Sequence, residues 1–436
     1  MKKMRELVEK ADGLWVANQR DSAIPLYVAL LDRDLDDPYL WLRAALGLKH
    51  FRLQLAAAEN LEASAVALGS QGNLLLALVA AKELSDLDPQ AAERIWQRLG
   101  RWYGMGSERL LEGLTTKPPV DRRLELDESS LELAEAKAVR AMLKDVCAAA
   151  QTHHSVPPDA DLQLPAHPLL SDLGVEDLSG FLPHLAVEYH DAGAEVITEG
   201  QAGQSFYMVA RGVVSIRANG VELAHLRSRS FFGEMALLTD APRSASVRCE
   251  APTILLRAER ATLELLAGKS PSVGEVLARY ARGRLLRNLM ACSPLFEPLD
   301  PKRRSQLIEL FGSSVFEAGE VIIDEGGDSP GLRMVLSGSV RVSKGQGTER
   351  LELGQLGPGG ILGEISLVKA GPASARVVAD TKTVILTLPR DDFHKKVGDF
   401  PEVLAHIWQV GTEREQGNLM ARGNPTKPID VGDILI

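Results

Sequence analysis

An internal duplication in the second part of the chain is the feature that most constrains its fold. Three segments of the first copy return in the same order in a second copy, with glycines and apolar residues at matching positions. The pairs are 167–170 with 293–296, 191–197 with 317–323, and 210–216 with 336–342. Two copies of one domain are therefore expected.

Each copy consists of short alternating runs between glycines. In the first copy the runs are Glu195–Ile197, Ser205–Val209, Gly212–Arg217 and Val221–Leu226. Strands this short, separated by turn glycines, predict a closed β-roll or jelly roll. A helical pattern follows from Glu259 to about Met290.

The first 150 residues or so have helical spacing of apolar residues and few glycines. Asp21–Leu31, with the Asp37-Pro38 stop after it, resembles the second helix of a tetratricopeptide repeat. Small Ala23 would let two helices approach, and Tyr27 would fill the gap between them. The resemblance implies helical hairpins with a groove for a partner, and an unrelated helical bundle is the alternative.

Taken together, the patterns predict a multidomain α+β chain. An all-α helical-hairpin domain is followed by two jelly-roll-like β-rolls with flanking helices. The expected boundaries are 1–115 for the tetratricopeptide-like domain, 116–165 for a helix and linker, 166–290 and 291–410 for the two rolls, and 411–436 for a C-terminal tail. The pair His153-His154 falls in the linker, and without a third ligand at metal-site spacing we expect it to be solvated.

A cassette in the first copy carries the most specific signal. Phe232–Leu238 is followed by Pro242–Val247, and this pattern resembles the cyclic-nucleotide-binding domain of catabolite activator proteins, cyclic-nucleotide-dependent kinase regulators and cyclic-nucleotide-gated channels. The resemblance covers both copies. It implies a β-roll that binds cAMP or cGMP.

The chemistry of such a ligand fits the residues of the cassette. Gly233 permits close backbone approach, and a helix that begins near Glu234 would direct free N–H groups at the phosphate. Arg243 offers a guanidinium fork to two phosphate oxygens, and Glu234 can accept from the ribose 2′-hydroxyl. The candidate binding residues are Gly233, Glu234, Met235, Ala236, Arg243, Ser244, Ala245, Val247, Arg279 and Tyr280.

Base preference stays open, because a hydroxyl such as that of Ser244 is compatible with guanine and with adenine. Alternation predicts that Ala245 and Val247 line the roll interior. Arg279 and Tyr280, together with Arg282, are candidates to cover the purine. Equally, their helix could merely link the two copies.

The second copy departs from the pattern. It keeps Gly363 and Glu364, but Ala373 and Ser374 stand where Arg243 and Ser244 stand in the first copy. Arg376 should point to the other face of its strand. We therefore expect a degenerate second site at Gly363, Glu364, Ala373 and Ser374, unless Arg333 or Arg341 supplies the charge.

Several function classes are disfavoured. A net charge of -10 and 5% aromatic residues speak against nucleic-acid binding, and no helix-turn-helix follows the second roll. No signal peptide, long apolar span, metal spacing or catalytic motif is evident, and three scattered cysteines suggest reduced thiols. We expect a cytoplasmic protein without membrane insertion, cofactor or enzyme activity.

The predicted function is a signal-transducing cyclic nucleotide sensor and adaptor. Ligand binding in the first roll would alter contact with a protein partner through the helical region or the second roll. The sequence is also compatible with a homo-oligomer. Two alternatives stay open. One is a scaffold that uses degenerate rolls only for interaction, and the other is a regulatory subunit of a separate enzyme.

Overall fold

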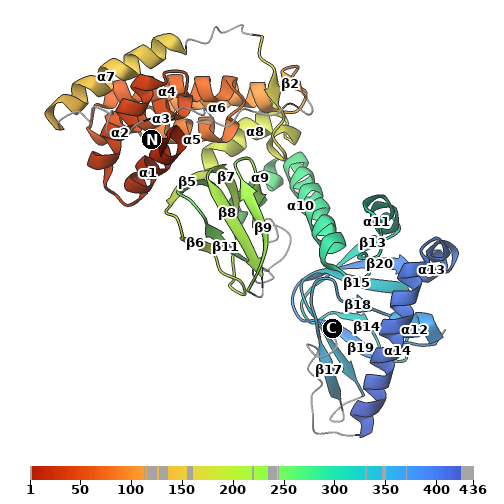
Figure 1. The fold of residues 1–436 in the computed structure, drawn as a ribbon. Helices are drawn as coiled ribbons and strands as arrows, with labels where there is room; N and C mark the ends of the chain where they lie inside the picture. The colour runs from red at the N-terminus through yellow and green to blue at the C-terminus, as the bar shows by residue number, and fades with distance from the viewer. Residues whose placement is uncertain are drawn as a thin grey trace. The chain divides into compact units, whose positions relative to one another are not determined.

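The computed structural model describes residues 2–111, 114, 125–126, 136–154, 161–218, 220–233, 243, 245–328, 331–345, 350–369 and 371–423 (Figure 1). These residues divide into two compact units, one running to Leu277 and one from Ala278 onward. Across the described ranges, no helix is both long and apolar enough to cross a membrane.

The first unit begins with the helical region that the sequence predicts. Its helices are α1 (Met4–Val16), α2 (Arg20–Arg33), α3 (Pro38–His50), α4 (Gln54–Ser70), α5 (Leu74–Ser85) and α6 (Pro89–Tyr103). Each packs on its chain neighbour, and α7 (Ala136–His153) packs on α2, α3 and α4. Hairpins of this kind are what a tetratricopeptide resemblance implies, although the resemblance itself stays a prediction.

Asp-Pro pairs begin two of these helices. Asp37 accepts hydrogen bonds from the backbone N–H groups of Tyr39 and Leu40, at 2.9 and 3.4 Å, and Pro38 occupies the first helical position. Asp88 accepts from the Ala91 N–H at 2.9 Å in the same way. The prediction that Asp37-Pro38 separates two helices is confirmed. Proline is favourable at the first helical position because it has no backbone N–H, and the N–H at that position would have no partner within the helix.

The prediction of a solvated His153-His154 linker is correct only in part, because His153 is exposed but belongs to a helix, and His154 is half-buried. Helix α7 continues through His153, which pairs with half-exposed Asp36. The His154 Nε2 donates to the Leu35 carbonyl at 2.6 Å, and the ring stacks on Trp41 with centroids 5.5 Å apart. Leu35 and Asp36 lie in the turn between α2 and α3, and Trp41 lies in α3, so all three partners are far from the histidines in the sequence.

Both copies form the same eight-stranded roll. The first contains β5 (Ala186–His190), β6 (Glu195–Ile197), β7 (Ser205–Arg211), β8 (Val213–Ala218), β9 (Val221–Arg227), β10 (Phe231–Phe232), β11 (Ser246–Cys249) and β12 (Thr253–Glu259). Its two sheets have the orders β10-β7-β12-β5 and β6-β11-β8-β9. The strands predicted from alternation all form.

The second roll repeats this topology strand for strand. It contains β13 (Gly312–Phe316), β14 (Val321–Ile323), β15 (Gly331–Ser337), β16 (Val340–Lys344), β17 (Leu351–Leu356), β18 (Ile361–Leu362), β19 (Arg376–Ala379) and β20 (Thr383–Pro389). Its sheets have the orders β13-β20-β15-β18 and β14-β19-β16-β17. The duplication predicted from the sequence is thus a duplication of fold.

The remaining described elements flank the rolls. The long helix expected after the first roll is divided into α9 (Arg260–Lys269) and α10 (Pro271–Cys292), because Pro271 cannot continue the hydrogen bonding of α9. The others are α8 (Val175–Phe181), α11 (Pro301–Ile308), α12 (Glu364–Lys369), α13 (Arg390–Lys396), α14 (Pro401–Gly423) and the short pairs β1 (Lys2–Lys3) with β3 (Glu125–Leu126) and β2 (Leu110–Leu111) with β4 (Leu164–Pro165). The expected tail boundary at residue 411 falls inside α14, and residues 424–436 lie outside the described part of the chain.

Within the first unit, a buried carboxylate joins the helical region to the first roll. Asp12 of α1 is 3% exposed and accepts from the hydroxyls of Tyr27 and Tyr39, at 2.5 and 2.6 Å. It also accepts from Arg43 Nη2 of α3 and from Arg211 Nε at the end of β7, each at 3.0 Å. One carboxylate therefore links three helices to a strand of the roll.

The two arginines determine the ionisation of Asp12. Burial alone would raise the pKa of this carboxyl, but the charges of Arg43 and Arg211 and the two tyrosine hydroxyls outweigh burial and hold the pKa below its usual value. The Arg211 guanidinium also lies 4.0 Å from the centroid of the Tyr39 ring. The carboxylate is therefore charged at neutral pH.

We predict that Asp12→Asn lowers the free energy of unfolding of the first unit by about 3–5 kcal/mol, since two buried arginines lose their shared counter-charge. Calorimetric unfolding of the full chain measures this. Glu222→Gln is the control, because it removes an exposed ion pair with Arg217 and should cost less than about 1 kcal/mol. Equal effects of the two variants would contradict the account.

A comparison of wild type with Asp12→Asn at different pH values gives a second test of the ion cluster. The pKa of Asp12 in the folded protein lies below its usual value of 3.8. The contribution of Asp12 to the free energy of unfolding is therefore complete at neutral pH and is lost as the pH falls from about 3.8 through the folded pKa. The stability difference between wild type and Asp12→Asn should shrink in acid. A difference that grows on acidification would show that the carboxylate is not the stabilising form.

Candidate functional site

The structure brings Gly233 and Arg243 of the first cassette together. Arg243 Nη2 donates to the Ser205 carbonyl at 2.8 Å, and Nη1 donates to the Gly233 carbonyl at 3.2 Å. Gly233 has a φ of +82°, and a β-carbon there would lie 2.8 Å from the Ser205 oxygen. The guanidinium therefore lies next to a residue that must be glycine, and its contact with a phosphate stays a prediction.

A second glycine, which the sequence analysis missed, holds the arginine side chain. A β-carbon on Gly203 would lie 2.2 Å from Arg243 Nε and 2.6 Å from its Cζ. The same loop binds the arginine backbone, since Gly200 N–H donates to the Arg243 carbonyl and Arg243 N–H to the Gln201 carbonyl, each at 2.8 Å. A glycine two residues before a strand is too common a signal to single out Gly203 from the sequence.

The structure describes only some of the other predicted binding residues of the first cassette. Val247 lies inside the roll against Ile197 and Val214, as alternation predicted, while Ala245 is half-buried. Glu234, Met235, Ala236 and Ser244 lie outside the described residues. Their binding roles stay predictions.

The candidates for covering the purine lie on α10. Arg279 and Arg282 are exposed, and only the backbone of Tyr280 is described. This part of α10 belongs to the second unit. A role for these residues in binding a base therefore stays a prediction.

In the second roll, Ala373 occupies the backbone position of Arg243. Gly326 N–H donates to the Ala373 carbonyl at 2.8 Å, and Ala373 N–H donates to the Gly327 carbonyl at 2.9 Å. These two bonds repeat those that Arg243 makes in the first roll. The Ala373 side chain is 8% exposed and packs in the apolar interior with Ile323, Leu362 and Val377.

The other arginines considered for this site are engaged elsewhere. Arg376 pairs with Asp324 at 2.9 Å on the outside of its strand, as alternation predicted. Arg341 is half-exposed and pairs with Asp380, while Arg333 donates to the Ile322 carbonyl. Ser374 is half-buried next to Ala373.

The retained glutamate of the second cassette is bound by the C-terminal helix. Glu364 begins α12, is 4% exposed and accepts from Arg414 Nη1 of α14 at 2.9 Å. The same nitrogen donates to the Ile361 carbonyl at 2.6 Å. Gly363 keeps the φ of +82° seen at Gly233. At Gly363 and Ala373 the second cassette thus repeats the backbone geometry of Gly233 and Arg243, and its Glu364 is bound within the protein.

No metal site accompanies either cassette in the part of the chain that the structure describes, where no group of three or more His, Cys, Asp or Glu side chains could hold an ion.

Comparison with known proteins agrees with this architecture. The family model for the cyclic nucleotide-binding domain matches residues 187–269 and 314–399, one match in each roll. The chain therefore carries two domains of the cyclic-nucleotide-binding family in tandem, after an N-terminal helical region.

Curated relatives share this part of the chain. The cAMP-dependent protein kinase regulatory subunit of Yarrowia lipolytica is 30% identical over 55% of this chain and 60% of its own length. The type II regulatory subunit of Drosophila melanogaster is 28% identical over 48% of this chain and 54% of its own length. The chain thus spans little more than half of these relatives.

Solved structures include the regulatory subunit of a cAMP-independent protein kinase A from Trypanosoma brucei. It is 24% identical, covers 58% of this chain and 92% of its own chain, and has a TM-score of 0.28.

We predict that Arg414→Met destabilises the second unit by about 3–5 kcal/mol, because Glu364 is left buried without a counter-charge. Thermal unfolding followed by calorimetry measures the loss. Adding Glu364→Gln to Arg414→Met should restore part of it, and Arg376→Gln, at a more exposed pair, should cost less than about 1 kcal/mol. If the double variant is no more stable than Arg414→Met, the pair does not stabilise the roll.

Proposed function

We propose that this chain is a regulatory protein that binds one cyclic nucleotide, cAMP or cGMP, in its first roll. The observation that carries the proposal is the Arg243 guanidinium, held by Gly203 and directed at the carbonyls of Ser205 and Gly233. The matched family model and the names of the relatives support the ligand class.

A phosphodiester is a better partner for Arg243 than these carbonyls. An anion can accept two parallel charge-assisted hydrogen bonds from the guanidinium fork, and such bonds are roughly twice as strong as those to neutral acceptors. Binding would therefore draw the guanidinium away from Ser205. Because the Arg243 guanidinium lies directly against Gly203, a side chain at that position would displace it.

Strand β7 gives this exchange a route to the helical region. Ser205 begins the strand and accepts from Arg243, while Arg211 ends it and pairs with Asp12 at 3.0 Å. A ligand that shifts the first residue of β7 acts on the strand that carries the interdomain ion pair. Coupling requires that the two states of the helical region bind nucleotide with different affinity.

The output is proposed to be contact with a protein partner through the helical region. A regulatory subunit of a separate kinase is a second candidate, favoured by relatives named as regulatory subunits of cAMP-dependent protein kinase. A scaffold that binds no nucleotide would not explain why the Arg243 guanidinium is packed against Gly203.

We predict that titration calorimetry with cAMP and with cGMP gives a stoichiometry near one per chain for the ligand that binds. Arg243→Ala should weaken its affinity by roughly 30- to 1000-fold, and Gly203→Ala should weaken it too, because the new methyl group displaces the guanidinium. Arg248→Ala removes an exposed arginine of β11 and is the matched control.

Absence of binding by either nucleotide at micromolar concentration would refute the sensor proposal. A stoichiometry of two would refute the assignment of the second roll as degenerate. If the chain is a kinase regulatory subunit, the protein purified from its native source should co-purify with a kinase catalytic subunit, and added cyclic nucleotide should change the amount recovered. An amount that does not change with added nucleotide would count against this candidate.

A further inference from the structure

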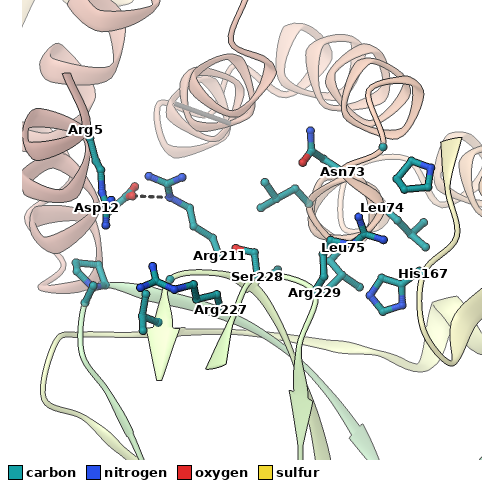
Figure 2. A pocket seen from close by; sticks show the side chains of 18 of the residues that line it. Arg5, Asp12, Asn73, Leu74, Leu75, His167, Arg211, Arg227, Ser228 and Arg229 are labelled. Carbon is teal, nitrogen blue, oxygen red and sulfur yellow. Dashed lines mark hydrogen bonds and ion pairs between the residues drawn. The ribbon is translucent and has the colours of Figure 1, made fainter. Parts of the chain in front are cut away.

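A cavity of about 440 Å³ lies in the first unit between the helical region and the first roll. Figure 2 shows Arg5, Asp12, Asn73, Leu74 and Leu75 on the helical side, with Arg211, Arg227, Ser228 and Arg229 opposite them. This volume is in the range of small-molecule binding sites. Arg243 is not among its lining residues, so the cavity is separate from the proposed nucleotide site.

The lining is positively charged although the whole chain is acidic. Four arginines and two carboxylates face the cavity, namely Arg5, Arg211, Arg227, Arg229, Glu9 and Asp12. Arg5 pairs with Glu9 at 2.8 Å and Arg211 with Asp12 at 3.0 Å, so both carboxylates are already compensated. Arg227 is the last residue of β9, and Arg229 follows two residues later, where its Nη2 donates to the Ala166 carbonyl at 2.7 Å. Both arginines add positive charge on the roll side (Figure 2).

A helix N-terminus faces the same space. Helix α5 begins at Leu74, and the side chain of its N-cap residue Asn73 makes no capping hydrogen bond. The first-turn N–H groups of a helix have no partner within the helix, and together they attract anions. Leu74, Leu75 and Leu76 also supply an apolar wall.

A buried histidine provides the independent sign of a ligand. His167 lines the cavity, is 3% exposed, and its Nε2 has no hydrogen-bond partner among the described residues. Its Nδ1 lies 2.6 Å from the Pro168 carbonyl and must donate to it. Burial lowers the pKa of His167 to about 4, so the ring is neutral and Nε2 presents a lone pair.

An acceptor in an otherwise cationic cavity restricts the ligand. The arginines and the helix N-terminus favour an anionic group, while Nε2 of His167 favours a hydroxyl, amine or ring N–H on the same molecule. A buried acceptor without a partner is unfavourable, and such a donor on the ligand would satisfy it.

From this geometry we propose a second ligand site, for a small phosphorylated metabolite that also carries a hydrogen-bond donor. The phosphate contacts Arg227, Arg229 and the N-terminus of α5, and the donor contacts His167 Nε2. Because the cavity walls come from both the helical region and the roll, this ligand stabilises their contact.

The test is titration calorimetry of the full chain with ribose 5-phosphate, inorganic phosphate, ribose and citrate. Ribose 5-phosphate should bind, inorganic phosphate should bind more weakly, and ribose should not bind. Arg227→Gln should weaken ribose 5-phosphate by about 10- to 100-fold. His167→Phe should remove the preference for ribose 5-phosphate over inorganic phosphate, with calorimetric unfolding used to check that each variant folds.

Two variants separate this site from the proposed nucleotide site. Arg243→Ala should bind ribose 5-phosphate as wild type does, and Arg217→Gln, an exposed arginine outside the cavity, should do the same. Loss of binding in Arg243→Ala would place the anion in the roll and overturn the proposal. No binding at millimolar concentration, no effect of Arg227→Gln, or equal binding of citrate would overturn it as well.

Discussion

The ion cluster around Asp12 is the constraint on which the first unit depends. A single carboxylate from α1 receives two arginines and two tyrosine hydroxyls, and one of those arginines is the last residue of β7. Burying these charges is costly, and the cost is offset only while all partners are in place. The cluster therefore selects one arrangement of the helices against the roll.

Comparison of the two rolls shows that Arg211 is specific to the first. The equivalent residue of the second roll is Ser337, which is buried, so the second copy has no cation to offer at that position. Further bonds join the same two parts of the first unit, because Tyr189 of β5 donates to Glu83 at 3.0 Å and Lys82 to the Pro183 carbonyl at 2.8 Å. The first roll thus contacts the helical region through several side chains, and these contacts are the physical connection that the proposed coupling requires.

The two cassettes differ in chemistry on one backbone. Both hold residue 243 or 373 through the same pair of main-chain hydrogen bonds, and both keep glycine at φ +82°. The first puts a guanidinium on this framework, and the second puts a methyl group there and pairs its glutamate with Arg414. The two rolls therefore share backbone geometry at these two positions and differ in the side chains that it carries.

Local pattern was enough to predict much of this. Alternation and glycine spacing predicted the strands of the first roll, and the internal duplication predicted those of the second. The sequence also shows that Ala373 stands where the first copy has Arg243. Sequence could not reveal the contacts between distant segments: Asp12 with Arg211, His154 with Leu35, or Glu364 with Arg414. Gly203 was missed for the same reason, since its role depends on a side chain that comes 40 residues later.

The central claim is that a nucleotide at Arg243 acts on the helical region through β7 and Asp12. Hydrogen–deuterium exchange of the full chain with and without the bound nucleotide tests it most directly. The account predicts altered protection in β7 and in α1 and α3 of wild type, none in Arg243→Ala, and a response confined to the roll in Asp12→Asn. A wild-type response that stops at the roll and leaves α1 and α3 unchanged would contradict it.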